Sequence, residues 1–122
     1  MLRNLACRYD NEYDIYRISW EGLTTPEDVR AFWLSILEEV PPQCEGFLVD
    51  QNDVEFNNSF AAYKVVTDVF VENTNVFGNR RIAVLVDSPK LLAEFVMMQR
   101  KSGGAVLKPF SDEDVAIKWI LT

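Results

Sequence analysis

The chain has 122 residues, 48% of them hydrophobic, and a formal net charge of -7. This length fits a single domain, residues 1–122, with a core that needs neither metal nor disulfide support. The negative charge disfavours nucleic acid and anionic lipid surfaces as partners, and because no apolar run approaches the roughly 20 residues of a membrane span, we expect no membrane insertion and a cytoplasmic protein.

The amino-terminal third of the chain predicts a β-hairpin followed by a helix. Leu2–Tyr9 and Tyr13–Trp20 are rich in aliphatic and aromatic residues and are separated by a polar tract that favours a turn;. A helix then begins at Pro26, because Thr25 before it can act as an N-cap and acidic residues follow in the first turn. Two prolines end this helix after Val40;.

Two continuous apolar runs predict buried parallel strands. Residues 47–49 and 82–86 are apolar throughout rather than alternating, and an aspartate follows each run. Strands that are buried on both faces of a parallel sheet have this composition. A short last strand over residues 106–110 contains Pro109, which favours an edge position because proline cannot donate a ladder hydrogen bond.

Three further helices are predicted between and after these strands. Apolar residues recur at helical spacing over residues 60–70, and turn residues follow over 73–79;. Ser88 is the expected N-cap of the next helix, and Ser111 opens the tract that caps the last one. The element order is therefore ββαβαβαβα, an α/β fold with a mixed, mostly parallel five-stranded sheet. Right-handed crossovers would place the four helices largely on one side of this sheet.

The residue inventory excludes several classes of chemistry. The chain has no histidine, and Cys7 and Cys44 are its two cysteines, with no CxxC spacing. We therefore expect no metal site and no nucleophile activated by histidine. The usual phosphate-binding glycine motifs are also missing, so we expect no cofactor and no enzyme activity. Asp50, Asp53 and Glu55 lie close together where a buried strand ends, which leaves open an enzyme that uses carboxylates or a hard cation.

One segment carries a recognisable motif. Leu48–Asp50, Val54–Phe56 and Asn58-Ser59 match, without gaps, a pattern of strand, loop and helix start. This pattern resembles the signature of the bacterial anti-sigma-factor antagonists, the STAS or SpoIIAA-like family, and the element order is similar to theirs. The ending, residues 110–120, is similar to the tail of an uncharacterised SpoIIAA-like branch. The resemblance implies a SpoIIAA-like (STAS-like) fold over most of the chain.

The same resemblance implies a function and a site. In that family an anti-sigma kinase phosphorylates the serine that opens the helix, and Ser59 falls on this serine. We therefore expect a non-enzymatic regulatory domain that docks a protein partner, such as an anti-sigma-type kinase, through the loop and the helix start. A phosphate on Ser59, which we place at the helix N-cap, would interact favourably with the helix dipole. The candidate partner-binding residues on this segment are Asp50, Asp53, Glu55, Asn57, Asn58 and Phe60.

The motif departs from the family pattern at the helix start. Antagonists usually carry Asp-Ser-Ser/Thr-Gly, whereas this chain has Asn58, Ser59, Phe60 and Ala61 in those places. The acidic partner, the second hydroxyl and the glycine are lost. These departures fit the branch that keeps the fold without the regulatory motif, and a serine N-cap is also an ordinary way to begin a helix.

Two further hypotheses concern other partners. The helices carry large aromatic residues, which fit either a core or a carrier of small apolar ligands or lipids of the Sec14-like kind. These residues are Phe32, Trp33, Phe70, Phe95 and Trp119. Tyr13 and Ile15 lie on the mixed face of the hairpin, where a self-complementary patch would support a homodimer.

Overall fold

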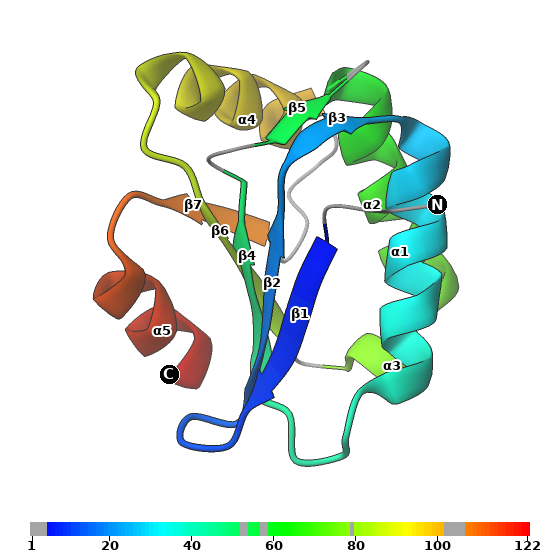
Figure 1. Ribbon diagram of the computed structural model, residues 1–122, viewed down its shortest axis with the longest axis vertical. Helices are drawn as coiled ribbons and strands as arrows, with labels where there is room; N and C mark the ends of the chain where they lie inside the picture. Colours follow the sequence, from blue (N-terminus) through cyan, green and yellow to red (C-terminus); the bar gives the residue numbers. More distant parts are fainter. Residues whose placement is uncertain (1–4, 52–53, 57–58, 79, 102–106) are drawn as a thin grey trace.

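A five-stranded mixed sheet forms the centre of the molecule, with helices against both of its faces (Figure 1). The computed structural model describes residues 5–51, 54–56, 59–78, 80–101 and 107–122. In the order of the sheet, the strands are β1 (Leu5–Asp10), β2 (Ile15–Trp20), β4 (Gly46–Asp50), β6 (Arg81–Leu85) and β7 (Leu107–Phe110). β1 is antiparallel to β2, and the other neighbours are parallel. The predicted sheet is thus confirmed, including the edge position of the strand that carries Pro109.

The helices divide unequally between the two faces of the sheet. The described residues form α1 (Pro26–Glu39), α2 (Ser59–Glu72), the short α3 (Thr74–Phe77), α4 (Pro89–Lys101) and α5 (Glu113–Leu121). Figure 1 shows α1, α2 and α3 along one face and α5 on the opposite face. The prediction of helices largely on one side is therefore confirmed, with α5 as the exception.

Two hydrophobic clusters fill the spaces between the sheet and the helices. The larger cluster lies between the helices and the sheet face that carries Phe47 and Ile82. Trp33 and Phe32 of α1 belong to it, and each is only 2% exposed. Phe95 of α4 belongs to this cluster. The smaller cluster lies under α5 and consists of Ile15, Leu48, Ala83, Leu85, Ala116, Ile117 and Ile120. The continuous apolar composition of β4 and β6 follows from this burial on both faces.

The predicted start of α1 is confirmed in detail. Thr25 is the N-cap, and its hydroxyl accepts a hydrogen bond from the Asp28 amide at 3.2 Å. The Asp28 carboxylate accepts in turn from the Thr25 amide at 3.2 Å. This reciprocal capping box satisfies two backbone amides that a helix start would otherwise leave unpaired.

Three short elements differ from the predicted order. β3 (Gly22–Thr24) pairs in parallel with β5 (Val54–Phe56), and together they form a separate two-stranded ribbon. The sequence instead predicts a break at Gly22 and a loop at Val54–Phe56. It also predicts a turn over residues 73–79, where α3 forms one helical turn. Elements of three or four residues are too short to display a periodic pattern, so they give no signal.

Arg80 has a structural role that its sequence position does not indicate. Consecutive basic residues such as Arg80 and Arg81 are typical of solvated element ends, but the Arg80 guanidinium binds backbone carbonyls of the segment between α1 and β4 and of α3. The carbonyl oxygens that accept from it belong to Pro41, Pro42, Cys44 and Val76. Arg81 likewise donates to the Trp119 carbonyl at 2.6 Å and lies over the Trp119 ring. Both arginines therefore bind segments that are distant from them in the sequence.

Candidate functional site

The segment predicted to dock a partner lies at the carboxyl ends of the parallel strands. Asp50 is the last residue of β4 and is half-buried. Beyond it, β5 pairs with β3, so that Glu55 is opposite Leu23. Leu23 is 68% exposed, so the ribbon carries an apolar side chain on its surface. Asp53, Asn57 and Asn58 are candidates that lie outside the described residues.

Ser59 occupies a slightly different helix position from the predicted one. α2 begins at Ser59 itself, so this residue is the first helical residue and not the N-cap. Phe60 is the second residue of the helix. The first turn of α2 contains no acidic residue, whereas α1 and α5 both carry two there. A negative group at this helix start would therefore interact favourably with the positive end of the helix dipole. No carboxylate on the same turn would repel it.

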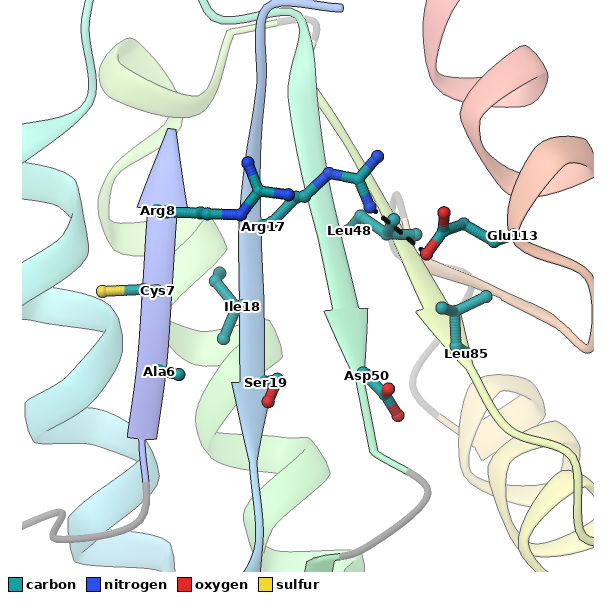
Figure 2. Close-up of a pocket in the computed structure, with 10 residues that line it drawn as sticks. All are labelled: Ala6, Cys7, Arg8, Arg17, Ile18, Ser19, Leu48, Asp50, Leu85 and Glu113. Atoms are coloured by element: carbon teal, nitrogen blue, oxygen red, sulfur yellow. Dashed lines mark ion pairs between the residues drawn. The ribbon is translucent and has the colours of Figure 1, made fainter. Parts of the chain in front are cut away.

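A second feature, which the sequence does not predict, is a hollow on the face of the sheet that α5 covers only in part (Figure 2). Its volume is about 310 Å³. We call it the sheet-face hollow. Its lining residues come from β1, β2, β4, β6 and the start of α5: Ala6, Cys7, Arg8, Arg17, Ile18, Ser19, Leu48, Asp50, Leu85 and Glu113.

The strand register explains why this face is hollow. Ala6, Ser19, Asp50 and Leu85 are successive partners across the four strands, and so lie in one row. The first two have small side chains that fill little space. α5 packs over the other half of the face, and the smaller core cluster lies there. The half near β1 and β2 thus stays open, and Asp50 joins it to the predicted docking edge.

Two arginines border the hollow on the adjacent row. Arg8 of β1 is directly opposite Arg17 of β2. Arg17 donates to the Asp10 carboxylate at 2.8 Å and pairs with Glu113 at 3.2 Å. Figure 2 shows the Arg8 side chain crossing β2 beside the stem of Arg17, which extends over β4 toward Glu113. Among the described residues, no carboxylate lies within ion-pair distance of Arg8.

Asp10 anchors Arg17 and also closes the hairpin turn. Its carboxylate accepts from the amides of Glu12 at 2.9 Å and Tyr13 at 3.4 Å. The hydrogen bond from Arg17, together with these amides, lowers the pKa of the Asp10 carboxyl;. The turn is completed by Asp14, whose φ is +55°. β2 therefore begins at Ile15, two residues later than predicted.

The lowered pKa of Asp10 leads to a prediction about acid stability. The carboxylate favours the folded state above the unfolded pKa of about 3.9, and this contribution disappears as the pH falls through the lower folded pKa. We expect the difference in unfolding free energy between wild type and Asp10→Asn to be constant from about pH 5 to pH 8 and to shrink below about pH 4. Denaturant titrations across this pH range measure it.

The control for this prediction removes the main cause of the shift. In an Arg17→Met background, the effect of Asp10→Asn on the unfolding free energy should depend less on pH, because the guanidinium no longer stabilises the carboxylate. An effect that stays unchanged down to pH values well below 4 in the wild-type background would contradict the assignment.

The hairpin face does not offer the homodimer patch that was predicted. Ile15 is 0% exposed because it packs under α5 in the smaller cluster. Tyr13 lies in the turn and is 37% exposed. The prediction failed at Ile15 because the alternation of the strand shows which residues share a face but not what covers that face. A homodimer through another surface stays a prediction.

The cysteines differ in their surroundings. Cys44 is buried, and burial raises the pKa of its thiol, which donates to the Gly46 carbonyl at 3.2 Å;. Cys7 is exposed, and the Tyr16 hydroxyl lies 3.9 Å from its sulfur. Within the described part of the chain, no three histidine, cysteine or acidic residues are grouped to hold a metal ion.

The aromatic residues considered for a ligand carrier pack mainly against one another. Trp33 has ring contacts with Phe70 and Phe77, and Phe95 contacts Tyr63 edge to face. Trp119 packs on Phe110 outside the larger core. These rings are core or helix-packing residues and are separate from the sheet-face hollow.

Among the helices that the structure describes, none combines the length and apolar character needed to cross a bilayer.

Comparison with known proteins identifies the fold. A solved structure with the same architecture is that of an uncharacterized protein of the DUF3478 family from Shewanella loihica PV-4, described as having a SpoIIAA-like fold. The two chains are 15% identical, with a TM-score of 0.64, and the match covers 96% of this chain and 94% of the other. No protein-family model and no curated protein matches the sequence. The chain has a SpoIIAA-like fold, as the motif at Leu48–Ser59 implied.

Proposed function

We propose that this protein is a non-enzymatic regulatory domain that binds another protein in the manner of the anti-sigma-factor antagonists. The contact surface is the edge formed by the β3–β5 ribbon, the segment from Asp50 to Ser59 and the start of α2. The observation that carries this proposal is Leu23, which is 68% exposed on the ribbon opposite Glu55. This side chain supplies apolar surface beside the polar candidates that a protein partner could bury.

The geometry of α2 supports control of this contact by phosphorylation of Ser59. As the first helical residue, Ser59 is at the positive end of the helix dipole, and the first turn of α2 has no acidic residue;. A phosphate there would add a charge of about -1.5 to -2 without opposing the helix. The expected effect is a change of surface charge at the docking edge, with the fold kept. The partner that phosphorylates it would be an anti-sigma-type kinase.

Quantitative affinity purification from the native cell tests the proposal. The tagged wild-type chain is compared with Leu23→Ser, Ser59→Ala and Ser59→Asp, and retained proteins are quantified by mass spectrometry. We expect one protein, an anti-sigma-type kinase, to be retained by wild type and Ser59→Ala. Leu23→Ser and Ser59→Asp should reduce its recovery about tenfold or more, as loss of an interface hot spot does.

A matched control separates the ribbon from apolar surface in general. Val71 near the end of α2 is 75% exposed, and Val71→Ser should keep the full recovery. The proposal fails if wild type retains no protein above the level of an unrelated bait. It also fails if Leu23→Ser and Val71→Ser reduce recovery to the same extent.

A further inference from the structure

We propose that the sheet-face hollow binds a small organic monoanion, whose carboxylate pairs with Arg8 and whose apolar body lies on the floor of the hollow. This inference is independent of the protein contact proposed above. It rests on the charge pattern of the two arginines, on the shape of the floor and on the acidic residue at the far side.

Arg8 is an exposed arginine on the rim of the hollow. Asp10 and Glu113 both pair with Arg17, at 2.8 and 3.2 Å, whereas the structure shows no carboxylate paired with Arg8 in the described part of the chain. Like charges directly opposite each other in an antiparallel pair are destabilising. The two carboxylates on Arg17 offset this repulsion, and the Arg8 guanidinium can donate a charge-assisted hydrogen bond to an anion in the hollow;.

The floor of the hollow suits an apolar body of modest size. Its volume of about 310 Å³ is at the lower end of the range of about 300–1,000 Å³ for small-molecule sites;. Leu48 and Leu85 supply apolar surface, and Ala6 leaves room beside Arg8. β1 and β6 are three strand spacings apart, roughly 14 Å, so a ligand anchored at Arg8 can extend across the floor toward Leu85.

The far side of the floor limits the charge of the ligand. Asp50 lies in the same row as Ser19 and Leu85, one row away from the arginines. Figure 2 shows its carboxylate at the end of β4, on the side of the hollow away from Arg8. A second negative group on the ligand would be repelled there. The hollow therefore favours a molecule with one carboxylate and an uncharged remainder.

Titration of the full-length, isotope-labelled protein followed by amide NMR shifts tests this inference. The probes are octanoate, its uncharged counterpart 1-octanol, and the dicarboxylate octanedioate. We expect octanoate to shift amides of residues 6–8, 17–19 and 48–50. It should bind about tenfold or more tightly than 1-octanol, because octanoate has a carboxylate that can pair with Arg8 and 1-octanol has none. Octanedioate should bind more weakly than octanoate, and Asp50→Asn should reduce that difference.

Two arginine variants decide the role of the guanidinium. Arg8→Gln should weaken octanoate binding about tenfold or more while leaving 1-octanol unchanged. The matched control is Arg30→Gln, which removes an arginine on α1 that pairs with Glu72 at the surface and should not alter octanoate binding. The inference is overturned if octanoate shifts no amide of the hollow at millimolar concentration, or if Arg8→Gln binds octanoate as wild type does. Equal binding of octanoate and 1-octanol would overturn it as well.

Discussion

Replacement of Trp33 by alanine should lower the free energy of unfolding by about 3–5 kcal/mol, the range found when large aromatic residues are removed from cores. Trp33 is 2% exposed and lies between the sheet and the helices. Its ring is 5.4 Å from that of Phe47 on β4 and 6.2 Å from that of Phe77 on α3. The loss combines the transfer of buried surface with the cavity that neighbouring rings cannot fill. Denaturant titration measures it.

A conservative variant tests the physical reason for this loss. The indole nitrogen of Trp33 is buried and has no hydrogen-bond partner among the residues that the structure describes. Trp33→Phe removes this unsatisfied donor while keeping an aromatic ring, so we expect it to cost less than half as much as the alanine variant. If Trp33→Ala does not fold, Trp33→Leu gives a measurable intermediate. A loss below about 1 kcal/mol for Trp33→Ala would contradict the assignment of Trp33 as the centre of the core.

Much of the fold could be predicted because its signals are local. The first helix has a complete set of signals: the N-cap Thr25, the proline that follows it and the two prolines after Val40. β4 and β6 are apolar throughout because helices cover both of their faces, and this composition distinguishes them from half-exposed strands. Pro109 indicated an edge strand, and β7 is an edge strand. In each case the residues that determine the local structure belong to the element itself or adjoin it in the sequence.

The features that escaped prediction depend on contacts between distant segments. The sheet-face hollow exists because α5 covers one half of a face and leaves the other half open. Arg8 and Arg17 become neighbours only through the register of the hairpin. The alternation of side chains along a strand does place Arg17 and Ser19 on the same face. A signal was therefore present, but it did not indicate which residues of other strands would join them.

The predicted docking segment is an intermediate case. Its motif identified the fold, and Asp50 does end a buried parallel strand as the motif implied. Pairing of Val54–Phe56 with Gly22–Thr24 was not predicted, because neither segment is long enough to show alternation;. That pairing is what brings Leu23 beside the segment. The sequence thus indicated the segment, and the long-range pairing places beside it the apolar residue on which the proposed contact depends.

Replacement of Gly46 by alanine should cost about 3 kcal/mol, near the upper end of the usual range for overpacking. A Cβ at this position would lie 2.6 Å from the Arg81 carbonyl oxygen and 2.6 Å from Cγ2 of Ile120. The first contact is with the backbone of the neighbouring strand, which cannot move without disturbing the sheet. The second presses on α5, whose Trp119 carbonyl is held by Arg81. We therefore expect both lower stability and looser packing of α5.

A double-mutant cycle divides this cost between the two contacts. Ile120→Leu removes the Cγ2 branch while keeping the side-chain volume, so alone it should cost less than about 1.5 kcal/mol. Combined with Gly46→Ala, it should recover part of the loss, and the remainder measures the contact with the Arg81 carbonyl. Amide hydrogen exchange should show weaker protection in α5 for Gly46→Ala than for the double variant. Additive costs for the two substitutions would instead show that α5 adjusts freely and that the clash lies within the sheet alone.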